Sequence, residues 1–113
     1  MLRVLLVMAP PKKAQILARQ VLEERLAACV NVVRPVNSLY WWKGKIDHAE
    51  EALLIIKTTK HNVMRLMKRV RMIHPYEVPE ILVLPVEAAH PPYVKWVEAE
   101  TQPPKQQRRS RRK

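Results

Sequence analysis

The chain has 113 residues, of which 48% are hydrophobic, and a formal net charge of +11 at pH 7. This length allows one domain with one core, and no apolar run reaches the ~18 residues that a membrane helix needs. The apolar N-terminal run is interrupted by Pro10 and Pro11 and lacks the charged start of a secretory signal, so we expect a cytoplasmic protein without a membrane segment. The single cysteine excludes an intrachain disulfide and a four-cysteine zinc site.

The positive charge is concentrated at the C-terminal end. Six of the 21 basic residues and none of the 10 acidic residues fall in 103–113, which leaves a net charge of +5 in 1–102. Segment 103–113 contains two prolines, two glutamines and no apolar residue. Such a segment cannot bury enough surface to offset its ordering entropy. We therefore predict a folded domain over 1–102 and a disordered basic tail over 103–113.

The first half of the chain predicts a strand, a helix and a second strand. Residues 2–9 form a continuous apolar run, which is typical of a strand buried on both faces. Pro10 and Pro11 then open a helix whose apolar stripe extends to Leu26. A second strand is predicted from about Ala28 to Trp42, with an irregularity at Pro35.

The second half predicts a turn, two further strands and two further helices. Gly44, the only glycine, marks the turn before a third strand at 52–58, which is apolar in its first five residues. An apolar stripe over 63–73 predicts a second helix. A fourth strand follows at 81–84, and a short final helix spans 91–100.

This order, β-α-β-β-α-β plus a helix, predicts an α+β fold, an α/β sandwich of the ferredoxin-like kind. Proline cannot donate to a strand ladder and therefore favours edge strands. Pro35 lies in the second strand, and Pro79 and Pro85 flank the fourth, so these two are the expected edges. With right-handed crossovers the sheet order is 4-1-3-2, and both main helices cover one face.

The pattern also predicts an oligomer. The run Ala52–Ile56 is apolar on both sides of its strand, yet both main helices lie on one face of the predicted sheet. Trp41 and Trp42 are adjacent, so on a strand they point to opposite faces. The final helix or other subunits must cover the second face, and open strand edges are further pairing sites. We therefore expect self-association.

Four segments carry a resemblance to a known family. In chain order they are Glu24-Arg25-Leu26-Ala27-Ala28-Cys29-Val30-Asn31, Ser38-Leu39-Tyr40-Trp41-Trp42-Lys43-Gly44-Lys45-Ile46, Leu54-Ile55-Ile56-Lys57-Thr58-Thr59 and His74-Pro75-Tyr76-Glu77-Val78-Pro79-Glu80-Ile81. With Tyr93 and Trp96, they cover about residues 2–101. On these motifs the chain resembles the CutA divalent-cation tolerance proteins, which are related in fold to PII-type signalling proteins.

The resemblance implies a ferredoxin-like subunit, a tight homotrimer and a link to divalent metals, mainly copper. In such a trimer the long second and third strands reach between subunits. Some family members are described as binding copper through a cysteine near the end of the first strand and a His-His pair before Pro-Tyr. Here the corresponding positions read Val7-Met8 and Ile73-His74, so only His74 matches.

Three residues are the metal-ligand candidates, and each has a structural alternative. The imidazole of His74 suits copper or zinc, although a histidine at a helix end is also favoured by the helix dipole. Cys29 could bind a soft metal such as copper(I) or be a small buried hydrophobe. Glu77, with Glu80 nearby, could bind a cation or belong to a solvated loop. The predicted interface residues are aromatic: Tyr40, Trp41, Trp42, Tyr76 and Trp96.

The leading hypothesis is a cytoplasmic, trimeric metal-binding or signalling scaffold in copper tolerance, without catalytic activity and without a metal required for folding. One glycine excludes a glycine-rich phosphate loop, and neither serine lies in a nucleophile motif. The first alternative is a nucleic-acid-binding module that uses the basic tail and the second helix. No aromatic residue lies among the basic residues of the second helix, which restricts this nucleic-acid hypothesis to non-specific binding through the tail. The second alternative is an enzyme with a subunit-interface cleft around His74, Tyr76 and Glu77.

Overall fold

The computed structural model describes residues 1–102, and the predicted disordered tail at 103–113 lies outside the described residues. The elements in chain order are β1 (Leu2–Ala9), α1 (Pro11–Glu23), β2 (Cys29–Trp42), β3 (Lys45–Thr59), a 3-10 turn η1 (Lys60–Asn62), α2 (Val63–Ile73), β4 (Ile81–Pro85) and α3 (Pro91–Glu100). No helix of this part of the chain is both long enough and apolar enough to cross a membrane.

The sheet has the predicted topology. Its order is β2-β3-β1-β4, with antiparallel pairing at every step. The two proline-marked strands, β2 and β4, are the edges, and the two apolar strands are central. The irregularity predicted at Pro35 is a register shift between Val33 and Val36, and the Arg34–Pro35 peptide bond is cis.

Helix α1 has a proline start and a left-handed end. Pro10 is its N-cap and Pro11 its first residue, where a missing N–H costs nothing. At the other end Arg25 adopts φ 60°. The Arg25 N–H donates to the Leu22 carbonyl and the Leu26 N–H to the Val21 carbonyl, the paired bonds of a Schellman motif. This end turns the chain from α1 into β2.

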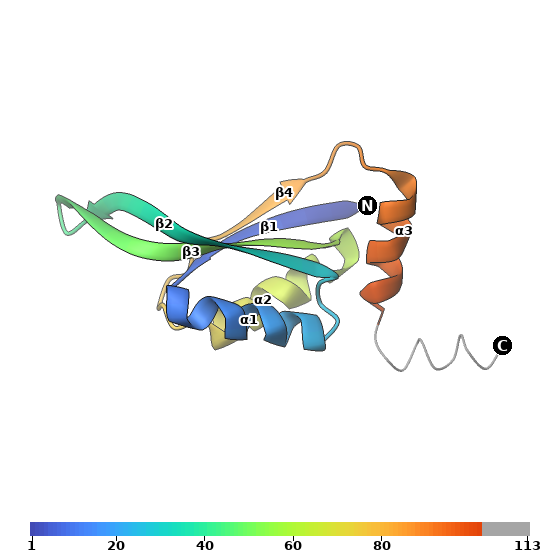
Figure 1. Ribbon diagram of the computed structural model, residues 1–113, viewed down its shortest axis with the longest axis horizontal. Coiled ribbons are helices and arrows are strands. Elements are labelled where there is room, and N and C mark those ends of the chain that lie inside the picture. The colour runs from blue at the N-terminus through green and yellow to red at the C-terminus, as the bar shows by residue number, and fades with distance from the viewer. Residues whose placement is uncertain (103–113) are drawn as a thin grey trace.

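Both main helices cover one face of the sheet (Figure 1). Alternate strand residues on that face are fully buried, among them Leu5 and Val7 of β1 and Leu54 and Ile56 of β3. They pack against the buried stripes of α1 and α2, in particular Leu17, Val21, Leu66 and Val70. This layer is the hydrophobic core.

The other face of the sheet is apolar and uncovered in the single chain. Leu82 and Leu84 of β4 pair with Leu6 and Val4 of β1, which alternate with the buried residues and so point away from the helices. Leu82 is 50% exposed and Leu84 43%. Helix α3 stands across the end of the sheet instead of over this face (Figure 1), and Val97 is its buried anchor.

The hairpin of β2 and β3 projects beyond the rest of the sheet as a two-stranded ribbon (Figure 1). Strand β1 pairs with β3 only from Ala52 to Thr59, while residues 45–51 pair with β2 alone. The predicted start of the third strand at Ala52 is wrong, because β3 begins at Lys45. The polar residues of 45–51 do not look like a strand, but the turn at Lys43-Gly44 pairs them with 36–42.

Candidate functional site

The segment between α2 and β4 is fixed by the buried His74. Pro75 disfavours a helical His74, so α2 ends there, and the backbone of His74 is extended at ψ 137°. His74 is only 7% exposed. Nε2 lies 2.7 Å from the Met8 carbonyl oxygen, and Nδ1 accepts a 3.0 Å hydrogen bond from the Tyr76 N–H. This pairing places the proton on Nε2 and leaves neither ring nitrogen without a partner.

Tyr76 links the same segment to the ribbon. Its hydroxyl donates a 3.0 Å hydrogen bond to the Glu51 carboxylate, and its ring lies 4.8 Å from the His74 ring, centroid to centroid. Burial, together with the hydrogen bond and negative charge of Glu51, raises the pKa of Tyr76 to about 12. Tyr76 is therefore a neutral phenol at physiological pH, and its hydroxyl acts as a hydrogen-bond donor.

Glu51 was not identified from the sequence. It is 8% exposed, although glutamate is rarely buried without a partner. Its partner comes from 25 positions further along the chain. The sequence contained one indication that Glu51 is buried, because this residue directly precedes the apolar run that begins at Ala52. The direction of the Glu51 side chain, however, follows only from the register of β2 and β3.

A pocket of about 470 Å³ lies between this segment and the ribbon. Six residues line it: Tyr40, Trp42, Pro75, Tyr76, Glu77 and Val78. Tyr40 and Trp42 are two positions apart on β2 and so share a face. The pocket combines three aromatic rings with one carboxylate and no basic side chain. We call it the aromatic pocket.

The three metal-ligand candidates do not meet within one chain. Cys29 pairs with Lys57 at one end of β3, while His74 contacts Met8, whose partner on β3 is Leu53. Four residues of strand separate these positions by about 13 Å. Glu77 is exposed at the aromatic pocket. In residues 1–102 no cluster of three or more His, Cys, Asp or Glu side chains could hold a metal ion.

Cys29 lies in a different polar environment. Its Sγ is 4.0 Å from Lys57 Nζ and 4.0 Å from Asn31 Oδ1. Burial and, to a smaller extent, the nearby Cys29 thiol raise the pKa of Tyr93. The Tyr93 ring packs 5.6 Å from the ring of Trp96.

The aromatic residues predicted to form an interface are partly or largely exposed in the single chain. Trp41 is the most exposed at 73%, and the others range from 37% to 58%: Tyr40, Trp42, Tyr76 and Trp96. Leu39 and Ile46 add to the apolar surface of the ribbon, at 67% and 65%. Contiguous apolar surface of this kind marks an association site.

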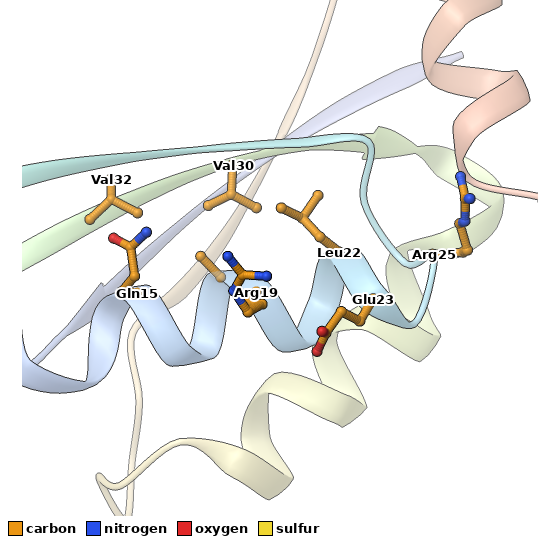
Figure 2. A pocket seen from close by; sticks show the side chains of 8 residues that line it. Gln15, Arg19, Leu22, Glu23, Arg25, Val30 and Val32 are labelled. Carbon is orange, nitrogen blue, oxygen red and sulfur yellow. The ribbon is translucent and has the colours of Figure 1, made fainter.

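A second hollow, of about 410 Å³, lies between α1 and β2. Figure 2 shows Gln15, Arg19 and Leu22 of α1 facing Val30 and Val32 of β2. No sequence motif indicated it. At its rim Arg25 pairs with Glu100 of α3 at 3.0 Å, so this arginine serves to hold α3.

Comparison with known proteins decides the family. The model of the CutA1 divalent ion tolerance protein family matches residues 3–100. The chain belongs to this family. A CutA protein from mouse is 50% identical over 91 residues, which are 80% of this chain and 51% of the mouse protein. The divalent-cation tolerance protein CutA from Thermus thermophilus is 41% identical over 99 residues, 87% of this chain and 96% of that protein.

Solved CutA structures share the fold. The Thermus thermophilus divalent cation tolerance protein has a TM-score of 0.86 and covers 90% of this chain and 100% of its own. The PII-like protein CutA from a Nostoc species, in apo form, has a TM-score of 0.84 at 36% identity, covering 88% and 97%. The fold is thus ferredoxin-like, as predicted, and the chain spans about half the length of the mammalian relatives it matches.

Proposed function

We propose that this CutA-family chain acts in divalent-cation tolerance as a cytoplasmic homotrimeric scaffold that binds or signals and catalyses no reaction. The observation that carries the proposal is the uncovered apolar surface on the sheet and the ribbon. A two-stranded ribbon is marginally stable on its own, and Trp41, at its tip, is 73% exposed. Other copies of the chain would cover both surfaces. The number three comes from the family resemblance.

The scaffold would fold without a metal. Every buried side-chain nitrogen or oxygen in the described part of the chain has a hydrogen-bond partner, and the core between the helices and the sheet is apolar. A metal-dependent fold instead brings several ligands to one centre. We therefore expect a chelator to leave the thermal midpoint unchanged.

A tolerance assay tests the scaffold role. In a copper-sensitive host that lacks its own CutA protein, the wild-type chain should restore growth on copper. The double variant Leu82→Lys, Leu84→Lys places two charges on the uncovered face and should abolish both assembly and rescue. Leu84→Met, which keeps the face apolar, is the matched control. Full rescue by a monomeric double variant would show that assembly is not needed.

Copper itself would bind at the segment that carries His74 and Glu77. Because both ring nitrogens of His74 hold hydrogen bonds, the metal would have to displace the Tyr76 N–H from Nδ1. Cys29 lies at the other end of β3 and would contribute only from another subunit. Such binding releases protons and weakens in acid, because protonated imidazole is not a ligand.

Calorimetric titration with copper(II) tests this placement. His74→Ala and Glu77→Gln should each weaken binding about tenfold, while Glu98→Gln on α3, far from the segment, should leave it unchanged. Equal affinity in all four proteins would place the metal elsewhere and return His74 to a purely structural role.

A further inference from the structure

The outer face of α2 combines positive charge with apolar surface. The helix contains four basic residues and no acidic residue. Its apolar side, with Leu66 and Val70, is buried. On the opposite side five exposed residues follow the spacing of one helix face, and we call them the outer stripe: Met64, Arg65, Lys68, Arg71 and Met72.

The charges of the outer stripe are not balanced within the described part of the chain. Of the four basic residues of α2, only Arg69 forms an ion pair within residues 1–102. Lys68 lies one helical turn from both Arg65 and Arg71, and like charges at this spacing repel each other. This repulsion destabilises the free helix, whereas a bound anionic group would relieve it. The stripe therefore has the charge of a surface that binds anions.

Two methionines frame these charges. Met64 is 76% exposed and Met72 is 67% exposed, and they lie about 12 Å apart along the helix axis. Methionine is unbranched and polarizable, so it adapts to apolar partners of different shape. Methionine and arginine are also both enriched in protein interfaces. The outer stripe thus has the composition of a protein-binding surface.

The outer stripe stays accessible in the proposed assembly. Helices α1 and α2 cover one face of the sheet (Figure 1), whereas other copies of the chain would cover the opposite face, with Leu82 and Leu84. The stripe lies on the side of α2 that is turned away from the sheet. In a threefold assembly the three stripes therefore point away from the axis in three directions, and each would bind its partner separately.

The methionines also decide which kind of anionic partner fits. Single-stranded nucleic acid requires aromatic rings among the basic residues, and the outer stripe has none. A nucleic-acid duplex offers mainly phosphates, which leave the methionines without an apolar partner. A flat membrane would meet only one of three outward-pointing stripes, and two methionines give that stripe little to insert. An acidic helix with one apolar face matches both the charge and the methionines.

We propose that the outer stripe of α2 binds an acidic amphipathic helix of another protein. The carboxylates of that helix pair with Arg65, Lys68 and Arg71. Its apolar side chains pack on Met64 and Met72. This interaction goes beyond the role in divalent-cation tolerance, and it requires neither a metal nor the segment after α2. It gives each subunit a docking surface of its own.

Calorimetric titration of the full chain with a helical model peptide of about 18 residues tests this proposal. The peptide carries leucine on one face and glutamate on the flanks of that face. It should bind with a dissociation constant below ~100 μM at low salt. A second peptide with glutamine in place of glutamate, and a third with alanine in place of leucine, should each bind at least about fivefold more weakly.

Substitutions in the full chain locate the binding surface. Lys68→Glu should weaken binding of the first peptide about fivefold or more, and Met64→Gln about threefold or more. Arg19→Glu is the matched control, because it makes the same charge change on the side of α1 that lines the hollow against β2 (Figure 2). It should bind the peptide like the wild type. Sedimentation should show that Lys68→Glu and the wild type form the same assembly.

Four outcomes would overturn the proposal. An equal loss in Lys68→Glu and Arg19→Glu would reduce the recognition to net charge. Dissociation of the Lys68→Glu assembly would make the stripe a contact between subunits. A DNA duplex or phosphatidylserine vesicles that bind more tightly than the first peptide, and lose that binding in Lys68→Glu, would assign the stripe to another class of partner. The fourth is the absence of peptide binding at ~1 mM by the folded wild-type chain.

Discussion

Tyr76 is the residue through which the segment after α2 holds the ribbon. Its hydroxyl satisfies the nearly buried Glu51 carboxylate, and its N–H satisfies His74 Nδ1. The first contact depends on the side chain and the second on the backbone. A substitution that removes only the hydroxyl therefore separates the contribution of Glu51 from that of His74.

Tyr76→Phe should lower the free energy of unfolding by about 1–2 kcal/mol, because a hydrogen bond to a carboxylate is lost and Glu51 stays largely buried. Urea denaturation measures the change. The control is Tyr93→Phe, whose hydroxyl donates no hydrogen bond within residues 1–102; it should change the free energy by less than about 0.5 kcal/mol. Equal effects of the two substitutions would show that the Tyr76–Glu51 hydrogen bond does not contribute to the free energy of unfolding.

The same pair predicts a pH dependence at the alkaline end. Burial and the neighbouring Glu51 raise the pKa of Tyr76 to about 12 in the folded chain, above the ~10 of an unperturbed tyrosine. The folded state therefore holds the proton more tightly than the unfolded state. The stabilisation that the protonated Tyr76 hydroxyl gives the folded state is complete below pH 10 and is lost as the pH rises toward 12. The stability difference between wild type and Tyr76→Phe should therefore shrink over this interval. A difference that stays constant to pH 12 would contradict the assignment.

At the scale of elements, the turn of the ribbon determines whether residues 36–51 form a hairpin. Lys43 and Gly44 both have positive φ, at 50° and 78°, as a two-residue type I′ turn requires. Glycine adopts this conformation without strain, whereas lysine does not. A Cβ added at Gly44 would meet no heavy atom within 4 Å. A substitution there would therefore act only through the backbone conformation.

Gly44→Ala should destabilise the hairpin by about 1 kcal/mol through backbone strain alone. Lys43→Asn should have the opposite effect, by a few tenths of a kcal/mol, because Asn-Gly is the preferred type I′ pair. Hydrogen exchange of the amides in 36–51 reports both changes locally. Slower exchange in Gly44→Ala than in Lys43→Asn would show that the turn is not limiting.

The elements also show which parts of the fold can be predicted from the sequence alone. Proline positions and two apolar runs predicted the edge and central strands, because these signals depend on local chemistry. The start of β3 at Lys45 could not be predicted from such local signals, since Asp47 and Glu50 are residue types that disfavour strands. Residues 45–51 form a strand only because they pair with β2. The hydrogen bonds of His74 to Met8 and of Tyr76 to Glu51 join segments 66 and 25 positions apart. No local pattern encodes those contacts.

At the scale of the whole molecule, one chain buries only one face of its sheet. The core lies between that face and α1 and α2 (Figure 1), whereas Leu82, Leu84 and the ribbon's tryptophans remain exposed. Large exposed apolar surfaces are rare on stable monomers. The scaffold proposal and the placement of the ribbon's aromatic residues both depend on self-association that covers these surfaces.

Sedimentation equilibrium at micromolar concentration, in the presence of a chelator, tests this central claim most directly. The account predicts a single species of three 13.3 kDa subunits. It also predicts that the chelator leaves this species unchanged, because the proposed scaffold folds and assembles without a metal. The double variant Leu82→Lys, Leu84→Lys should shift the population to monomer. A wild-type chain that sediments as a folded monomer under these conditions would contradict the account.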